Sequence, residues 1–241
     1  MRIHRLYTDQ PLEPGRETTL GDGPAHYLGR VLRAARGQSV VLFNGDGHDY
    51  PADVVRLSKT EVVLEVRSRL PAASESWLKV TVVQAVSRGE RMDRTLQKCT
   101  ELGATAFQPV WTERTEVKLA DRKLQKRMRH WRGVVISACE QSGRAVVPAV
   151  LEPVGLPDWL DTSTPAKRLV LSPDSECPIS RLEAQGRIEL AIGPEGGFSE
   201  AELDRMRASG VLSVGIGPRI LRTETAAPAA LAVLQALGGD F

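Results

Sequence analysis

The spacing of apolar side chains changes near residue 76 and divides the chain into two differently patterned regions. In the first region, short apolar runs alternate with polar residues, and Asn44-Gly45-Asp46-Gly47 between two of the runs is a strong signal for a chain reversal. One stretch, from Pro24 to Arg36, has apolar residues at helical spacing instead. The pattern therefore predicts a small β-barrel-like module with one short helix. The expected strands lie at residues 40–43, 50–56 and 61–66.

In the second region, continuous apolar runs alternate with helical patterns, which is typical of a parallel α/β sheet. Residues 78–86 form a nearly unbroken apolar run, as expected for a strand buried on both faces. The helix that starts at Glu90 is expected to stop at Gly103, and Pro228 is expected in the first turn of the last helix. Further strands are expected at 106–110, 168–171, 188–192 and 211–216, and further helices at 121–141, from 199 and at 226–237.

Two turns near the end of the chain each lie between an expected strand and an expected helix. The first covers residues 193–197, and Ser199 and Glu202 after it have the spacing of a capping box. The second covers residues 217–225. Because the carboxyl ends of parallel strands meet at one edge of the sheet, we expect both turns to line one ligand pocket there.

Known glycine motifs do not explain these turns. Neither has the lysine of a P-loop, and Gly215-Ile216-Gly217 begins a dinucleotide fingerprint without completing it. Glycine and proline often serve only the geometry of a turn. The segment 221–225, however, places a cation, an anion and two hydroxyl groups between apolar elements, and buried charge of that density favours a functional site.

The charge of the chain points modestly to a polyanionic partner. The net charge is only +2, but 25 of the 32 basic residues are arginine, whose planar fork suits phosphates and base edges. Several arginines recur at helical spacing, at residues 30–36, 88–94 and 122–132. Any one of these clusters is also compatible with an ordinary solvated helix face. It is the presence of three clusters that favours a polyanionic partner.

Other features of the sequence narrow the class of protein. No apolar stretch is long enough to span a bilayer, and the charged start of the chain lacks the apolar segment of a signal peptide, so a cytosolic location is expected. The three cysteines, Cys99, Cys139 and Cys177, are far apart and have no metal-ligand spacing. Neither disulfides nor a bound metal is therefore expected.

Several ordered blocks of the chain resemble the RsmE family, the SPOUT-class methyltransferases that act on N3 of a uridine in small-subunit (16S) ribosomal RNA. The two turns with their flanks, 192–199 and 216–226, resemble the paired motifs of that family. The other matching blocks are 26–33, 97–103, 113–114 and 138–144, so that the resemblance covers almost the whole chain.

This resemblance implies an architecture and a set of partners. The expected fold is an α/β chain with a PUA-like RNA-binding domain at residues 1–70 and a SPOUT methyltransferase domain at 71–241, the latter ending in a deep trefoil knot. The cofactor would be S-adenosyl-L-methionine, and the substrate small-subunit ribosomal RNA, within a ribosomal particle. Family members are homodimers, with the active site near the subunit interface.

The resemblance and the chemistry of the turns together assign roles to residues. Arg222 would stabilise the negative charge that develops on the uracil oxygens, and Glu195 or Glu224 would accept the N3 proton. A structural role for Glu224, in a pair with Arg222, fits the sequence equally well. The implied donor-binding residues are Leu171, Gly193, Pro194, Glu195, Gly196, Gly197, Ile216, Gly217, Ile220, Leu221, Arg222, Thr223 and Ala226. The implied RNA-binding residues are Arg30, Arg33, Arg88, Arg91, Arg114, Glu140, Gln141 and Arg144.

Two alternatives from other classes remain open at this point. One is a SPOUT enzyme with a different RNA target, such as transfer RNA or a ribose hydroxyl. The other is an RNA-binding protein without catalytic activity, whose N-terminal arginines do the binding.

Overall fold

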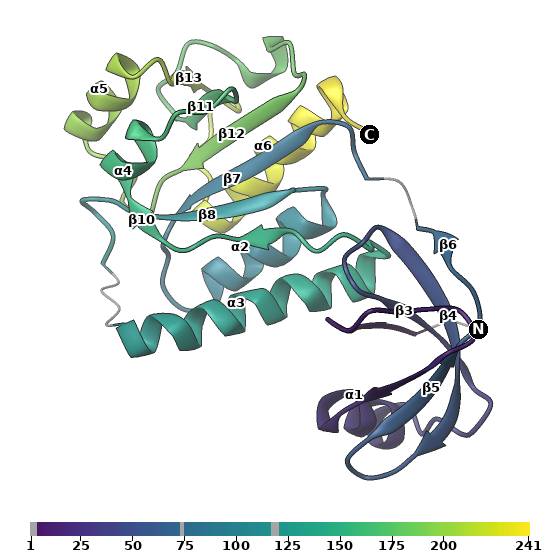
Figure 1. Ribbon diagram of the computed structural model, residues 1–241. Coiled ribbons are helices and arrows are strands. Elements are labelled where there is room, and N and C mark those ends of the chain that lie inside the picture. Colours follow the sequence, from purple (N-terminus) through teal and green to yellow (C-terminus); the bar gives the residue numbers. More distant parts are fainter. Residues whose placement is uncertain (1–3, 73–74, 117–120) are drawn as a thin grey trace. The chain divides into compact units, whose positions relative to one another are not determined.

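The chain divides into two units, and the first of them takes in a segment from the middle of the sequence. The computed structural model describes residues 4–72, 75–116 and 121–241 (Figure 1). The first unit runs to Glu75 and includes Cys139–Val147, whereas the second contains Ser76–Ala138 and Pro148–Phe241. The end of the long helix α3 (Asp121–Ser142) therefore belongs to the first unit.

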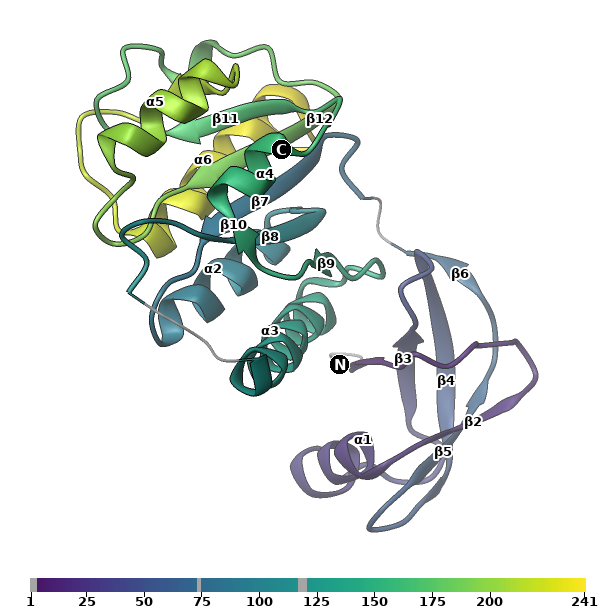
Figure 2. The same ribbon diagram turned by 60° about the vertical axis from the view of Figure 1, so that its left-hand side comes forward.

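The first unit is built on a curled sheet, in which β1 pairs with β3 in parallel and the other neighbours are antiparallel (Figure 2). The strand order is β1-β3-β4-β5-β2, and β6 also pairs with β4. The strands predicted from the apolar runs are confirmed as β3, β4 and β5. The bounds are β1 (Arg5–Tyr7), β2 (Glu17–Leu20), β3 (Ser39–Phe43), β4 (His48–Leu57), β5 (Val62–Val66) and β6 (Leu70–Pro71).

The helical stretch of this unit starts and ends earlier than its sequence pattern indicated. α1 (Asp22–His26) continues into a single turn of π-helix, η1 (Tyr27–Val31). Leu32 and Ala34 pack against the same core as the fully buried Leu28, and this packing takes the chain out of helical register. Arg33, one of the arginines at helical spacing, lies beyond the end of the helix with a φ of 50°.

A network of charged side chains joins the segment 139–147 to the rest of the first unit. The guanidinium of Arg144 binds both carboxylate oxygens of Glu75, with a distance of 3.1 Å from Nε to Oε1. Arg5 donates to the main-chain oxygen of Arg144 at 3.2 Å, and Glu140 accepts the amide of Tyr7 at 3.0 Å. Burial raises the pKa of Glu140, against the opposing effects of that amide and the Arg5 charge. Side-chain contacts thus attach a segment that is far away in sequence to the first unit.

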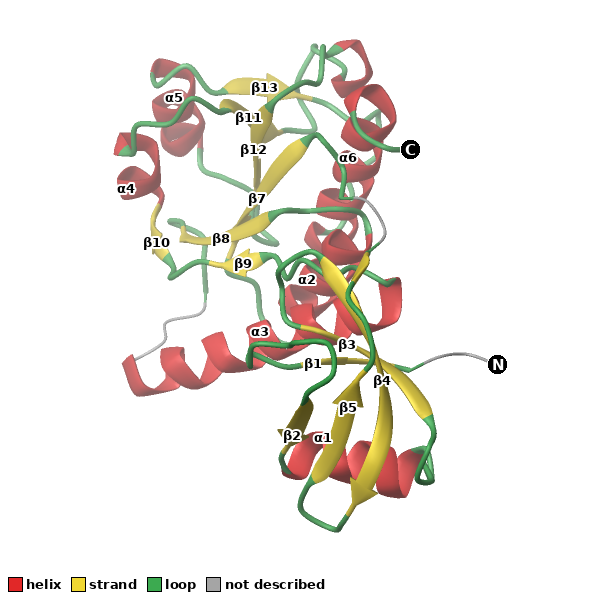
Figure 3. Ribbon diagram, turned by 45° about the vertical axis from the view of Figure 1, so that its right-hand side comes forward, coloured by secondary structure: helices red, strands yellow, loops and turns green. Residues whose placement is uncertain are grey.

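The second unit contains a parallel sheet with helices on both faces, as the alternating pattern predicted (Figure 3). The strand order is β10-β8-β7-β12-β11-β13, and β9 also pairs with β8. The strands are β7 (Lys79–Ala85), β8 (Ala106–Trp111), β9 (Ala149–Val150), β10 (Val154–Gly155), β11 (Lys167–Leu171), β12 (Arg187–Ile192) and β13 (Leu212–Val214). The helices are α2 (Glu90–Glu101), α3, α4 (Leu156–Asp161), η2 (Ile179–Arg181), α5 (Glu200–Ala208) and α6 (Thr223–Gly238).

The central strand β7 is buried on both faces, which explains its continuous apolar sequence. Val83 and Ala85 belong to a core cluster with Trp159 of α4 and Met206 of α5. On the other face lie α2 and α6, which pack against each other. The described part of the chain contains no helix that is long and apolar enough to cross a membrane.

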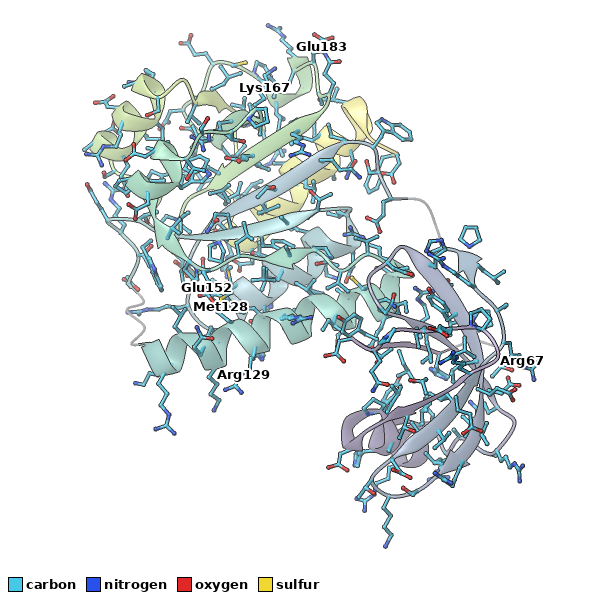
Figure 4. The ribbon with its side chains drawn as sticks, in the orientation of Figure 1. Arg67, Met128, Arg129, Glu152, Lys167 and Glu183 are labelled. Atoms are coloured by element: carbon cyan, nitrogen blue, oxygen red, sulfur yellow. The ribbon has the colours of Figure 1, made fainter. Side chains whose placement is uncertain are left out.

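The long helix α3 presents different residues to its two sides, as predicted. Trp131 and Val135 are buried, and Figure 4 shows Arg129 pointing away from the sheet and Met128 on the opposite face of the helix. α2 also follows the prediction, because it ends before Gly103, which has a φ of 88°.

The last helix begins earlier than expected. We expected it to start at Ala226, whereas α6 starts at Thr223, so Pro228 lies inside the helix and not in its first turn. Because proline has no N–H, Pro228 cannot donate the usual helical bond to the carbonyl of Glu224. The second turn, expected at residues 217–225, therefore ends at Arg222, where α6 begins.

Replacing Glu75 by Gln should lower the stability of the first unit by about 3 kcal/mol. The Arg144 side chain is only 10% exposed, so the substitution leaves a nearly buried charge without its counter-ion. Urea unfolding, with hydrogen exchange on the β3 to β5 amides, measures the loss. Glu13→Gln is the matched control, because Glu13 and its partner Arg16 are both exposed and such pairs contribute less than about 1 kcal/mol. Equal effects of the two substitutions would contradict the role given to this pair.

Candidate functional site

A cavity of about 580 Å³ opens at the carboxyl ends of β11, β12 and β13 in the second unit. Its walls are the segment 171–174 after β11, the first turn at 193–197 after β12 and the second turn at 216–222 between β13 and α6. This is the sheet edge at which the sequence pattern placed a pocket with two walls, and the volume lies in the range of small-molecule sites.

The first turn is shaped by its glycines and supported from behind by a neighbouring loop. Gly197 has a φ of 68°, and a side chain on Gly193 would lie 3.2 Å from the amide nitrogen of Phe198. Nη1 of Arg114, in the loop after β8, donates to the main-chain oxygens of Gly196 at 2.7 Å and Phe198 at 3.2 Å. The turn therefore presents main chain to the cavity in a fixed conformation.

The helix that follows the first turn begins with the predicted capping box. The hydroxyl of Ser199 accepts the amide of Glu202 at 3.1 Å, and Glu202 accepts the amide of Ser199 at 2.9 Å. The other carboxylate oxygen of Glu202 accepts the amide of Glu113 at 2.8 Å. One buried carboxylate thus fixes both the start of α5 and the loop that carries Arg114.

One threonine hydroxyl joins the two turns. Thr223, the first residue of α6, donates to the main-chain oxygen of Gly193 at 2.9 Å and accepts from Nε2 of Gln84 at 2.9 Å. Thr223 and Gln84 are buried, so these bonds lie out of water. They hold β7, the first turn and α6 in one arrangement.

Two glutamates and one arginine form the charged side of the cavity. Nη1 of Arg91 lies 2.7 Å from Oε1 of Glu195, and its Nε lies 4.0 Å from Oε2 of Glu224. Burial by itself would raise the pKa of Glu195, but hydrogen bonds from its own amide, from Arg91 and from the Arg88 amide, together with the Arg91 charge, outweigh it and lower the pKa below 4.5. Glu195 is therefore held as a carboxylate.

The cavity brings together all the residues that the resemblance assigned to donor binding and catalysis. Their lining positions are those predicted at 171, 193–197, 216–217, 220–224 and 226. The chain does not, however, bury every charge of the second turn. Arg222 is exposed, and within the described residues Glu224 is paired with Arg91, not with Arg222 as one sequence interpretation had it.

The predicted RNA-binding residues fall into separate groups. Arg91 and Arg114 line the cavity, and Arg88 pairs with Glu116 at 2.9 Å. The remaining five belong to the first unit, where Arg30, Arg33 and Gln141 are exposed while Glu140 and Arg144 take part in its charged network.

Sequence reasoning missed several residues of the site. Gln84 is a fully buried polar residue in an otherwise apolar strand, and that contrast was a usable signal. Ser172-Pro173-Asp174 directly follows the strand β11 and also lines the cavity. Arg219 and Leu203 line it as well. Within the described residues, no group of three or more His, Cys, Asp and Glu side chains is placed to hold a metal ion.

The chain matches two protein families along most of its length. Residues 74–235 match an RNA methyltransferase domain, and residues 20–67 match an RNA methyltransferase PUA domain. A ribosomal RNA small subunit methyltransferase E from a Synechocystis species is 35% identical over 91% of this chain and 73% of its own length. Another protein of that name, from Buchnera aphidicola, is 30% identical over 100% of this chain and 98% of its own length.

Two solved structures resemble the whole chain. One is a ribosomal RNA small subunit methyltransferase E from Neisseria gonorrhoeae bound to S-adenosyl methionine, with a TM-score of 0.93, 39% identity and full coverage of both chains. The other is a putative methyltransferase from Legionella pneumophila in complex with the bound cofactor SAM, with a TM-score of 0.96, 39% identity and full coverage of both chains.

Replacing Thr223 by Val should destabilise the second unit by about 2 kcal/mol, because the carbonyl of Gly193 loses its hydroxyl donor and Gln84 loses an acceptor in a buried place. Valine keeps the shape and branching of threonine, so the effect reports the hydroxyl. Thermal unfolding measures the loss, and hydrogen exchange at residues 193–197 locates it. Thr225→Val, at an exposed position of the same helix, should change stability by less than about 0.5 kcal/mol. A similar loss in both variants would contradict the conclusion that the Thr223 hydroxyl joins the two turns.

Proposed function

Because the chain belongs to the ribosomal RNA small subunit methyltransferase E family, we propose that it transfers the methyl group of S-adenosylmethionine to N3 of one uridine in small-subunit (16S) ribosomal RNA. The observation that carries this proposal is the cavity between the two glycine turns. Both turns carry the motifs by which the sequence resembles RsmE, and two full-length structural relatives contain the methyl donor.

The lining of the cavity fits this donor. S-adenosylmethionine supplies a methyl group already activated by a sulfonium, so the chain needs only to bind it and direct the acceptor toward it. The main-chain groups of the two turns suit the polar atoms of an adenosine and an amino acid. The side chains of Leu171, Ile192 and Ile216 give the cavity apolar surface for a purine, and the carboxylates of Asp174 and Glu195 suit a cationic ligand.

The chemistry of uridine N3 requires a proton acceptor and stabilisation of negative charge. N3 carries a proton, and its loss spreads charge over the two flanking carbonyl oxygens. Arg222 is exposed at the rim of the cavity, within reach of an incoming substrate, and would stabilise that charge. Glu195 or Glu224, which both line the cavity, would accept the proton.

RNA binding is proposed to involve both units. Residues 1–70 would form a PUA-like RNA-binding domain and residues 71–241 the catalytic domain. The family match at 20–67 and the exposed Arg30 and Arg33 support this assignment. The other residues proposed to contact RNA are Arg88, Arg91, Arg114, Glu140, Gln141 and Arg144.

We also propose the remaining properties of the family for this chain, which are a C-terminal trefoil knot, a homodimer and a cytoplasmic role in ribosome biogenesis. The knot is supported by the segment after β13, where the main-chain oxygen of Gly215 accepts the amide of Ile179 and its amide donates to the oxygen of Cys177, before α6 packs on β7, β12 and α2. The homodimer is supported by Ile220, an apolar side chain 86% exposed at the cavity. A second subunit would cover it.

Mapping of the methylated nucleotide tests the function directly. In a strain that lacks this gene, N3 methylation of one uridine in small-subunit ribosomal RNA should disappear and return with the gene. Full N3 methylation in the deletion strain would overturn the proposal. Loss of a methyl group from transfer RNA or from a ribose hydroxyl would support a different SPOUT target, and absence of S-adenosylmethionine binding by calorimetry would support a non-catalytic RNA-binding protein.

Arg222→Ala should reduce methyl transfer by at least about 100-fold, because a cation that stabilises developing charge acts mainly in the transition state. The side chain is exposed, so the unfolding temperature should stay close to that of the wild type. Methylation of isolated small subunits with a radiolabelled donor measures the effect. The control is Arg205→Ala, an exposed arginine on α5 outside the cavity. Near-normal turnover of Arg222→Ala would remove this residue from the mechanism.

Gly196→Val should weaken donor binding by more than about tenfold, because a branched side chain here would press on Arg114, whose guanidinium fixes the main chain of the turn. Gly196→Ala is the graded comparison, since its Cβ would lie 3.5 Å from Cδ of Arg114, an ordinary contact. Calorimetry with S-adenosylmethionine gives both affinities. Unchanged affinity in the valine variant would contradict the assignment of the cavity to the donor.

A further inference from the structure

Arg91 stands between two carboxylates that come from opposite walls of the cavity. Arg91 is the second residue of α2. Glu195 lies in the glycine turn at 193–197, and Glu224 is the second residue of α6. Its contacts with the two are unequal, at 2.7 Å to Glu195 and 4.0 Å to Glu224. The two candidate proton acceptors therefore have different surroundings.

One carboxylate oxygen of Glu195 accepts two hydrogen bonds, one from α2 and one from the segment just before it. Oε1 accepts from Nη1 of Arg91 and from the amide of Arg88 at 3.3 Å. These bonds and the charge of Arg91 outweigh burial and hold the pKa of Glu195 below its ordinary value. A carboxylate stabilised in this way is a weak base toward a nitrogen acid.

Glu224 is in the opposite situation. Its side chain is 10% exposed, and within the described residues its buried Oε2 atom has no hydrogen-bond partner. A buried carboxylate oxygen without a donor is costly, so the site is suited to receive a donor from outside the chain.

We propose that Arg91 gives the two carboxylates different tasks, by fixing Glu195 as part of the donor site and leaving Oε2 of Glu224 to accept the proton of uridine N3. This inference rests on the proposed function. In the reaction the N3–H bond breaks and its proton passes to Glu224. The N3 electron pair forms the bond to the methyl carbon, and the electron pair of the broken carbon–sulfur bond stays on sulfur. Arg91 is then a positioning residue for the two carboxylates.

Other charged side chains line the same cavity as Glu224, and a pH-dependent measurement includes their effects. Besides Arg91 from α2, the charged side chains in the lining are Arg114, Asp174, Glu195, Glu200, Arg219 and Arg222. The Gln variants of single carboxylates keep this surrounding charge nearly constant. The effects of Glu195 and Glu224 on the pH profile can therefore be measured separately.

The test compares Glu224→Gln, Glu195→Gln, Arg91→Ala and Arg91→Lys in the full-length protein. Donor affinity is measured by calorimetry, and the single-turnover methylation rate of small subunits is measured across pH. Glu224→Gln should keep donor affinity within about threefold, lower the rate by at least about 100-fold and abolish the acid limb of the pH profile. Glu195→Gln and Arg91→Ala should weaken donor binding by about tenfold, and Glu195→Gln should keep the acid limb. Arg91→Lys, which retains one cation near Glu195, should restore part of the affinity.

Glu183→Gln, an exposed position outside the cavity, is the matched control (Figure 4). Loss of the rate and of the acid limb in Glu195→Gln, with both retained in Glu224→Gln, would overturn the assignment. Equal losses in both would overturn it as well, because they would mean a shared task. If the wild type fails to methylate uridine N3, the proposed function is wrong, while calorimetry still decides whether Arg91 and Glu195 hold the donor.

Discussion

The hydroxyl of Thr223 is the interaction on which the arrangement of the site depends. It accepts from Gln84 in the central strand and donates to Gly193 in the first turn, while its own main chain starts the last helix. A hydroxyl can do this because it is both donor and acceptor. The two turns come from different strands, so without such a link each would follow its own helix. With it, they form the two walls of one cavity.

Charge in the cavity is arranged in neighbouring opposite pairs. Arg91 lies between Glu195 and Glu224, and the loop cation Arg114 is engaged with main-chain oxygens of the first turn. A cationic donor and a polyanionic substrate have opposite requirements, which a site of uniform charge would not meet. In the proposed function, carboxylates toward the donor and an exposed Arg222 at the rim would satisfy both requirements.

The fold class and most elements could be predicted from the sequence, because buried positions leave a regular pattern of apolar residues. The apolar run at 78–86 has only one good explanation, a strand covered on both sides, and the match to known structures confirms the α/β class with a PUA-like module before a SPOUT domain. The strands β9 and β10 have two residues each, too few to show a period. Pro228 was misplaced because the helix start is set by Thr223, whose partners are distant in sequence.

The positions of the two main-chain turns that form the site could be predicted, whereas the pairing of its charged side chains could not. Glycine turns can be recognised from a few consecutive residues. Every residue that the resemblance assigned to donor binding lines the cavity. The pair of Arg91 and Glu195 joins residues 104 positions apart, and no local pattern distinguishes it from an arginine that faces RNA. Likewise, no local pattern indicates the pair of Arg144 and Glu75, which are 69 positions apart.

The position of α6 also determines when during synthesis the cavity can exist. This helix supplies Thr223 and Glu224, and its far end is fixed where Gln235 accepts from Ser76 and donates to the carbonyls of Leu102 and Gly103. A growing chain therefore carries all the strands of the sheet before it has a second wall for the cavity. The cavity can therefore form in full only once α6 has left the ribosome.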